Sequence, residues 1–363
     1  MKNDKILLDH GSGGKISHSL TKDMMLPIFD NAILAALNDG AIFELEGKRF
    51  AFSTDSYTVD PVFFPGGNIG DLAINGTVND IAMCGATPLY LSVGLIIEEG
   101  LPLEDLDTIM NTMGLAAKTA GVMVITGDTK VVPRGTADRI FINTSGIGLI
   151  PEGIHVSSDN ARAGDKIILS GTIADHGITI LTQREGLSFA TSLQSDSAAL
   201  NHLIEKMFAA ADPAAIHVLR DPTRGGVGTA LNEIAEMSKI GVEIIEDKIP
   251  LKTEVAGACE LLGFDPLYLA NEGKLMAFVA ADQAEAAAAQ QVQRHHQQGE
   301  PGDDELSAGS GLGHESAPCL RDRPSFVESV PPAAGAPWIV RFNQAGLMPI
   351  RTARPEGPRP PGN

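Results

Sequence analysis

The chain has 363 residues, a formal net charge of −19 and 43% hydrophobic residues. This length is enough for about two domains and at least one sizeable core. The excess of acidic residues argues against a nucleic-acid-binding protein, which needs a basic face, but still allows a nucleotide held through metal ions. No apolar run reaches the roughly 18 residues of a membrane span, and the three cysteines form no CxxC pair. We therefore expect a cytoplasmic globular protein that binds neither nucleic acid nor a membrane.

Strand and helix patterns alternate along the first part of the chain. Residues 49–59 predict a strand whose end delivers Asp55, and residues 69–84 predict a helix closed by Gly85. Apolar residues at helical spacing between 103 and 117 predict a second helix, with Gly121 as its C-terminal cap. A strand over 122–126 is expected to end in the turn 127–130, and a further strand covers 140–150.

The second part of the chain begins a new unit near residue 164. Strands are predicted at 166–170, 242–245 and 275–280, and helices at 197–211, 226–239 and 253–262. These patterns indicate an α+β protein with an N-terminal domain over 1–155 and a C-terminal domain over 156–290. Residues 291–363 hold 11 of the 22 prolines and no lysine, so we expect this tail to be irregular.

A glycine-rich segment, His10-Gly11-Ser12-Gly13-Gly14-Lys15, lies close to the start of the chain. Glycines let the backbone approach a phosphate, and successive N–H groups form an anion-binding nest. The segment does not match the GxxxxGK[ST] phosphate-binding loop. A simple N-terminal turn is the alternative interpretation.

The predicted helix at 69–84 carries a polar stripe. Asp71, Asn75 and Asn79 follow one another at intervals of four residues, and Asp80 lies beside the end of the stripe. A solvated helix face is the ordinary explanation for such a pattern. However, asparagine is a poor helix former, and the neighbouring residues are apolar. The stripe therefore also fits a wet groove that holds a ligand.

Three further aspartates follow strands or lie in turns, where a rigid scaffold usually presents binding groups. They are Asp55, Asp128 and Asp221. Mg²⁺ takes one or two protein carboxylates and completes its shell with water and phosphate oxygens. A single aspartate of this kind is most often a turn or cap residue, so the hypothesis of a Mg²⁺–nucleotide site depends on their number.

Two more motifs carry candidate chemistry. In RDPTRGG (220–226), Arg220 and Arg224 flank Asp221, and a diglycine opens a helix whose N-terminus attracts anions. A helix entry with a local ion pair is the plain alternative. Glu272 lies in a turn before a strand, where it is either a general base or a turn residue. The histidines have no metal-ligand spacing, and Cys84 and Cys259 fit core positions.

Six segments together resemble the hydrogenase maturation HypE family of carbamoyl dehydratases. They are HGSGGK (10–15), STDSY (53–57), GDLAINGTVNDIAMCGATPLYLS (70–92), GDTKVV (127–132), RDPTRGGV (220–227) and ANEGK (270–274). They follow the family's order up to about residue 290. GTVNDIAMCGA alone indicates the wider superfamily of aminoimidazole ribonucleotide synthetase, selenophosphate synthetase and thiamine-phosphate kinase, and the other segments make the match specific.

The resemblance implies an ATP-dependent dehydration. In that family, the carbamoyltransferase HypF loads a carbamoyl group onto a C-terminal cysteine. ATP phosphorylates the carboxamide oxygen, and loss of phosphate leaves a thiocyanate. The cyano group then passes to the iron of [NiFe] hydrogenase through the HypC–HypD complex. The implied fold has two α+β domains, like that of aminoimidazole ribonucleotide synthetase, with N-terminal domains pairing in a homodimer so that their sheets form a barrel.

The same resemblance implies roles for individual residues. Those implied to bind Mg²⁺ are Asp55, Asp71, Asp80, Asp128 and Asp221. Those implied to lie near ATP are Gly13, Gly14, Lys15, Thr54, Thr77, Asn79, Arg220 and Arg224. Those implied for catalysis are Lys130 at the γ-phosphate, with Glu272 and His10 in proton handling near the thiocarboxamide.

The tail departs from the family. Family members end in Pro-Arg-Ile-Cys, whereas this sequence reads RPPGN at 359–363 and has its last cysteine at Cys319. A shift of reading frame after about residue 290 accounts for both this departure and the change of composition. Without a terminal thiol, we expect no protein-bound thiocyanate on this chain. The alternatives are a selenophosphate-synthetase-like or kinase-like ATP-dependent enzyme, and a non-catalytic scaffold for the maturation partners.

Overall fold

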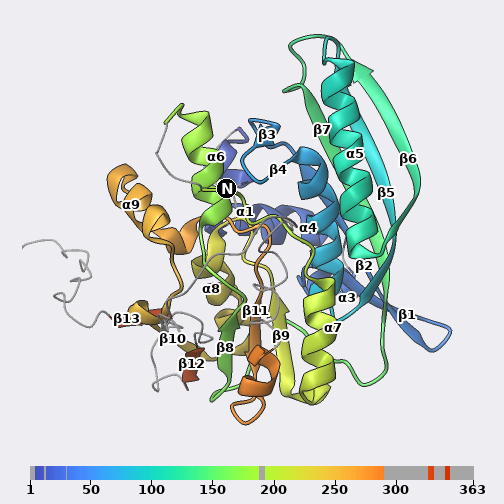
Figure 1. Ribbon diagram of the computed structural model, residues 1–363. Helices are drawn as coiled ribbons and strands as arrows, with labels where there is room; N and C mark the ends of the chain where they lie inside the picture. Colours follow the sequence, from blue (N-terminus) through green and yellow to red (C-terminus); the bar gives the residue numbers. More distant parts are fainter. Residues whose placement is uncertain are drawn as a thin grey trace, which may run out of the picture.

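The computed structural model describes residues 5–11, 14–29, 31–187, 193–289, 326–330 and 340–343. Two β-sheets with helices packed against them form two units, which lie side by side in Figure 1. None of the helices in these ranges is long and apolar enough to cross a membrane.

The first unit is a five-stranded sheet with the order β1-β2-β7-β5-β6. Its strands are β1 (Ala41–Leu45), β2 (Lys48–Tyr57), β5 (Thr87–Glu98), β6 (Met123–Val132) and β7 (Ile140–Ile150). Neighbours are antiparallel except β5 and β6, which are parallel. Side chains along β7 alternate between buried and more accessible positions, as expected when one sheet face is covered.

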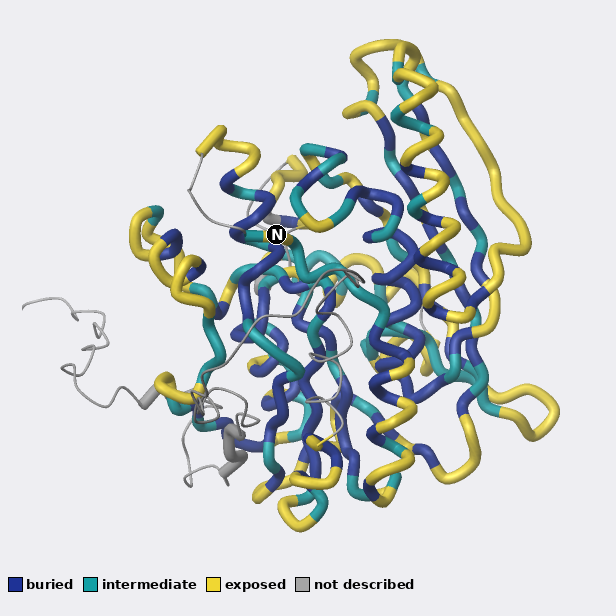
Figure 2. Tube along the Cα trace, in the orientation of Figure 1, coloured by how far each residue is buried: buried dark blue, intermediate teal, exposed yellow. Residues whose placement is uncertain are grey.

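Two helices cover one face of this sheet, α4 (Ile69–Met83) and α5 (Leu103–Ala120) (Figure 1). Ile74, Val78 and Ile81 of α4 are fully buried in a cluster with Ile142 of β7. Each such side chain contributes about 1.5–3 kcal/mol by leaving water. The core of the first unit therefore lies between α4 and the sheet, while the other sheet face and strand β6 are accessible (Figure 2).

The second unit is a six-stranded sheet with the order β13-β10-β12-β8-β11-β9. Its strands are β8 (Lys166–Leu169), β9 (Ile216–Arg220), β10 (Gly241–Ile245), β11 (Met276–Val279), β12 (Phe326–Val330) and β13 (Val340–Asn343). Its helices are α6 (Asp175–Arg184), α7 (Asn201–Ala210), α8 (Gly226–Ser238) and α9 (Thr253–Leu262). Apolar side chains of α7 and of α8 are buried in two different clusters with alternate residues of β8 and β11, so helices cover both sheet faces.

Short elements complete the described chain. The N-terminal segment holds η1 (Leu8–His10), α1 (Gly14–Leu20), η2 (Thr21–Met25), α2 (Leu26–Phe29) and α3 (Ala32–Ala35). The remaining short elements are β3 (Phe63–Phe64), β4 (Gly67–Asn68), η3 (Pro213–Ala215), η4 (Glu246–Lys248) and η5 (Pro266–Tyr268).

Most predicted elements are present, and three differ. The strand expected to end at 126 continues to Val132, because 126–132 pair in parallel with β5. The helix expected from 197 begins at Asn201, because residues 197–200 instead bind the asparagines of α4. The tail expected to be irregular contains β12 and β13, which pair with β8 and β10; its other residues lie outside the described ranges.

Candidate active site

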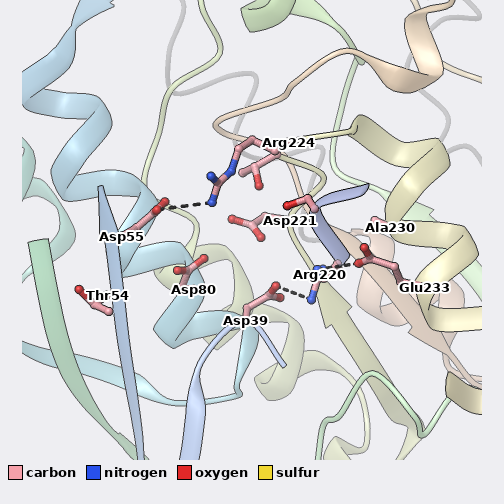
Figure 3. A pocket seen from close by; sticks show the side chains of 11 residues that line it. Asp39, Thr54, Asp55, Asp80, Arg220, Asp221, Arg224, Ala230 and Glu233 are labelled. Carbon is pink, nitrogen blue, oxygen red and sulfur yellow. Dashed lines mark hydrogen bonds and ion pairs between the residues drawn. The ribbon is translucent and has the colours of Figure 1, made fainter. Parts of the chain in front are cut away.

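A cavity of about 290 Å³ lies where the two units meet. We call it the acidic cavity. Its lining residues are Ser17, Asp39, Thr54, Asp55, Asp80, Arg220, Asp221, Thr223, Arg224, Ala230 and Glu233. Figure 3 shows carboxylates from both units facing the same space, with two arginines of the second unit beside them.

Three of the aspartates predicted to bind metal meet in the acidic cavity. Asp55 comes from β2, Asp80 from α4, and Asp221 directly follows β9. Burial, and then the negative charge of Asp39, raise the pKa of Asp221 to about 8. Burial raises the pKa of Asp80 well above its usual range, and the charge of Asp221 adds to this effect. The protein therefore gathers more carboxyl groups here than its own cations keep ionised.

The donor set fits Mg²⁺. Asp221 Oδ2 is buried and has no hydrogen-bond partner, so an acceptor is left free inside the cavity. Among the described residues, no three His, Cys, Asp or Glu groups are grouped closely enough to enclose a metal ion by themselves. Mg²⁺ commonly takes only one or two protein carboxylates and obtains its other ligands from water and phosphate. This cavity therefore suits a metal ion that arrives with a phosphate group.

The two arginines of the RDPTRGG motif have different environments. Arg220 donates to Asp39 Oδ1 (2.6 Å) and to Glu233 Oε2 (3.0 Å), and its side chain is 20% exposed. Arg224 is 63% exposed and lies 3.7 Å from Asp55, in weak contact. Arg220 is thus held in place by two carboxylates, whereas the guanidinium of Arg224 is accessible for a ligand.

Sequence reasoning missed Asp39, Ser53 and Glu233. Ser53 Oγ donates to Asp80 Oδ2 (2.7 Å) and so orients that carboxylate. Asp39 lies with Gly40 in the bend that precedes β1. A position in a turn beside a strand is also what singled out the other aspartates. Glu233 reaches Arg220 from the helix α8, and its position in the sequence gives no sign of this contact.

Glu272 lies near the acidic cavity but does not line it. Burial raises its pKa well above the usual range, and the charges of Asp221 and Asp196 raise it further. Its carbonyl oxygen accepts from Asn79 Nδ2 (3.4 Å). Asn79 also accepts from the N–H of Leu200 (2.8 Å), so its amide joins the two units.

Asp71 and Thr77 also lie on α4 but do not line the acidic cavity. Asp71 accepts from the N–H of Asn68 and caps the start of α4, and burial raises its pKa. Thr77 is buried, with its hydroxyl 2.6 Å from that of Thr144. Both predicted roles at the ligand remain predictions.

Lys130 and Asp128 lie apart from the acidic cavity. Both belong to β6 and line a second cavity of about 360 Å³, with Ser56 and Asn143 among its other residues. Lys130 Nζ lies 3.7 Å from Asp128 Oδ2, and both side chains are more than two-thirds exposed. Their partners across the β5–β6 pair, Gly94 and Ile96, belong to the sheet face opposite α4. We call this second cavity the sheet-face cavity.

The N-terminal candidates have mixed positions. His10 is buried, and its Nδ1 accepts from the N–H of Leu7 (3.0 Å) within its own turn. Helix α1 begins at Gly14, while the side chain of Lys15 and the whole of Gly13 lie outside the described residues. Thr54 lines the acidic cavity, and its role near ATP stays a prediction.

Comparison with known proteins gives matches over both units. The N- and C-terminal domains of AIR synthase related proteins match residues 37–150 and 162–299. The carbamoyl dehydratase HypE of Rhizobium leguminosarum bv. viciae is 54% identical over 287 residues, covering 79% of this chain and 82% of that protein.

Two solved structures extend the comparison. The crystal structure of a HypE–HypF complex contains a chain with a TM-score of 0.78 and 44% identity, covering 93% of this chain and 100% of that one. A hydrogenase maturation protein HypE in complex with ATP gives a TM-score of 0.66 and 54% identity, covering 79% and 85%. The two-domain fold, the motifs and these relatives together show that the chain belongs to the HypE family of carbamoyl dehydratases.

Proposed function

We propose that this chain is an ATP-dependent carbamoyl dehydratase, which converts the S-carboxamide of a protein C-terminal cysteine to a thiocyanate for [NiFe] hydrogenase maturation. The observation that carries the proposal is the acidic cavity, in which burial, and then the charges of neighbouring carboxylates, raise the pKa of Asp80 and Asp221 beside the accessible Arg224. Clusters of perturbed ionisable groups in a cleft are typical of functional sites. A solved relative in complex with ATP supports a nucleotide there.

The reaction removes the carboxamide oxygen as phosphate. The γ-phosphoryl group of ATP bonds to that oxygen, and the carbon–oxygen bond then breaks to give R–S–C≡N, ADP and inorganic phosphate. The two N–H protons are released, one of them to phosphate. When it is ionised, a carboxylate with a raised pKa is a stronger base than an ordinary one, and burial raises the pKa of Glu272. We assign it the proton-accepting role near the thiocarboxamide, with His10 as a second candidate.

We assign Mg²⁺ to the acidic cavity, with Asp55, Asp80 and Asp221 as its protein contacts. When bound, Mg²⁺ supplies positive charge that neutralises the phosphate oxygens. Arg224 is placed to bind phosphate, because its guanidinium is accessible, while Arg220 orients the acidic residues through its two ion pairs.

A homodimer would account for the accessible face of the first sheet. Phe52 and Ile96 on this face are each 43% exposed, and Tyr90 is 39% exposed. Large apolar side chains gathered on one sheet face are typical of an interface. We propose that two such sheets pair and form a barrel. Lys130 and Asp128 lie on this face, so their roles at the phosphates and at Mg²⁺ belong to the dimer.

The partners follow from the family. We propose HypF as the carbamoyl donor, since a solved relative is a HypE–HypF complex. We further propose that the HypC–HypD complex accepts the cyano group, that the protein acts in the cytoplasm, and that its domains divide near residue 155.

The test supplies the substrate separately from the chain. A peptide ending in Pro-Arg-Ile-Cys with an S-carbamoyl group is incubated with the protein, Mg²⁺ and ATP. We expect phosphate release that depends on the peptide, and a peptide mass lower by one water. ATP turnover without any change of peptide mass would instead support a kinase-like enzyme. Absence of both ATP binding and turnover would support a scaffold.

A further inference from the structure

A short segment that is neither helix nor strand connects the two units next to Glu272. Residues 194–200, which we call the bridging segment, contact α4 on one side. Asn75 Nδ2 donates to Ser197 Oγ (3.1 Å), and Asn79 Nδ2 donates to the carbonyl of Ala198 (3.1 Å). The N–H of Ser195 donates to the carbonyl of Pro65 (2.8 Å). The bridging segment is therefore attached to the first unit by these three hydrogen bonds and by the one from the N–H of Leu200 to Asn79.

The other side of the bridging segment holds the turn that carries Glu272. Asp196 Oδ1 accepts from the N–H of Glu272 (3.1 Å), and Asp196 Oδ2 pairs with Lys274 Nζ (3.1 Å). The side chain of Asp196 is 3% exposed and that of Lys274 is 14% exposed, so this is a buried ion pair. A Cβ at Gly273 would overlap the carbonyl oxygen of Asp196, so the turn and the segment are in direct backbone contact.

A second buried group holds the same turn from the side of the RDPTRGG motif. Asn271 is fully buried, and its Nδ2 donates to the carbonyl of Pro222 (3.0 Å), next to Asp221. Its Oδ1 accepts from the N–H of Ala174 (2.7 Å). Glu272 therefore lies between two anchors, one attached to α4 through Asp196 and the other attached to the loop of Asp221.

We infer that Asp196 is a positioning residue for the dehydration. Asp196 holds the backbone N–H of Glu272 and the ammonium group of Lys274 at once, and so fixes Glu272 relative to the acidic cavity. The inference rests on the proposed function of Glu272. A carboxylate suits this position because one of its oxygens accepts a hydrogen bond from a backbone N–H, while its negative charge pairs with an ammonium group. Misplacing a reacting group by about 1 Å costs about 100-fold in rate.

The test compares Asp196→Ala and Asp196→Asn with Asp212→Asn. Asp212 is a matched control, because its carboxylate also accepts from a backbone N–H of the second unit but caps the short η3 turn. With the carbamoylated peptide we expect kcat to fall about 100-fold in Asp196→Ala, with KM for ATP within about twofold of the unchanged protein. Asp212→Asn should match the unchanged protein. A parallel loss of kcat and ATP affinity would overturn the positioning role.

Two further measurements separate this inference from the proposed function. The double variant with Lys274→Met and Asp196→Asn should have a kcat no lower than that of the slower single variant, because both substitutions remove the same ion pair. Hydrogen exchange at 270–275 needs no activity, and Asp196→Ala should accelerate it while Asp212→Asn should not. If the unchanged protein turns over no peptide, the proposed function fails. If exchange at 270–275 is the same in Asp196→Ala, the positioning role fails.

Discussion

The carboxyl groups of the acidic cavity cannot all ionise without a free-energy penalty in the absence of a ligand. Asp221 is buried and Asp80 is half-buried, both have raised pKa values, and the ion pairs in the cavity involve Arg220 and the exposed Arg224. Burial of an unpaired charge is unfavourable, and a bound cation removes the penalty. Ligand binding and stability of the free protein should therefore respond in opposite directions when one carboxylate is neutralised.

Asp80→Asn tests this opposition. We expect Mg²⁺-dependent ATP affinity to fall at least about tenfold, which is about 1.4 kcal/mol, because one contact to the metal is weakened. The melting temperature of the ligand-free protein should rise, because asparagine is neutral without the proton uptake that the raised pKa of Asp80 requires. Calorimetry and thermal unfolding measure the two effects, with Asp138→Asn on an exposed loop as the control. Unchanged Mg²⁺–ATP affinity would remove Asp80 from the metal site.

His176 predicts how stability depends on pH. Burial lowers its pKa from 6.5 to about 4, and its Nδ1 lies 2.8 Å from Ser195 Oγ. Below pH 6.5 the unfolded chain takes up a proton that the folded protein does not. Stability should therefore fall as the pH drops from about 6.5 to about 4, by at most about 3 kcal/mol from this group. Below pH 4 the effect levels off.

The measurement compares urea unfolding at pH 4.5 and pH 7 in the unchanged protein and in His176→Gln. Glutamine keeps a polar partner for Ser195 but does not titrate in this range. The difference in unfolding free energy between the two pH values should be smaller in His176→Gln. An equal difference in both proteins would mean that other groups carry the dependence.

Among the elements, α4 contacts both the second unit and the sheet of its own unit. It presents Asp80 to the acidic cavity, Asn75 and Asn79 to the bridging segment, and Gly76 to β2. A Cβ at Gly76 would overlap the hydroxyl oxygen of the buried Tyr57. Glycine in a helix interior costs about 1 kcal/mol relative to alanine, so packing accounts for its presence here.

Gly76→Ala should therefore destabilise the protein by about 1–3 kcal/mol, although alanine is the better helix former. Adding Tyr57→Phe removes the hydroxyl and should recover most of the loss. Urea unfolding of the two single variants and the double variant checks this. The packing explanation would be wrong if Gly76→Ala were as stable as the unchanged protein, or if Tyr57→Phe gave no recovery in the double variant.

The same helix shows what the sequence could and could not predict. Its bounds and its polar stripe followed from periodicity, because local spacing decides both. The stripe, however, binds a protein segment: Asn79 contacts Ala198 and Leu200, far along the chain. Helix α6 was missed because Gly177 and several β-branched residues weaken its helical pattern. Contacts between distant segments leave no periodic signal, and this is also why Asp196 and Glu233 escaped notice.

Over the whole molecule, the two cavities lie on opposite faces of the first sheet. Asp80 and Asp221 face the side of α4, whereas Lys130 and Asp128 lie on the accessible face. The family resemblance assigned these four residues to one site. The order of motifs along the chain, however, does not tell on which face of the sheet Lys130 and Asp128 lie. Their separation makes the oligomeric state central to the proposed chemistry.

Phe52→Glu is expected to convert a dimer to a monomer, because it places a charge on the accessible apolar face of the sheet. Leu261→Glu is the matched control, since Leu261 is also exposed (71%) but lies on α9. Analytical ultracentrifugation over a range of concentrations gives the oligomeric state of all three proteins. A dimer that survives Phe52→Glu, or an unchanged protein that is monomeric, would contradict pairing through this face.

The position of β12 has a consequence for synthesis of the protein. All strands of the first sheet lie within residues 41–150, so that unit is complete early in translation. In the second sheet, β12 joins β8 to β10 but follows β8 by roughly 150 residues. While the ribosome makes the intervening residues, the edges of β8 and β10 are unpaired and open to neighbouring chains. The second unit is therefore expected to be most prone to aggregation before residues 326–330 emerge.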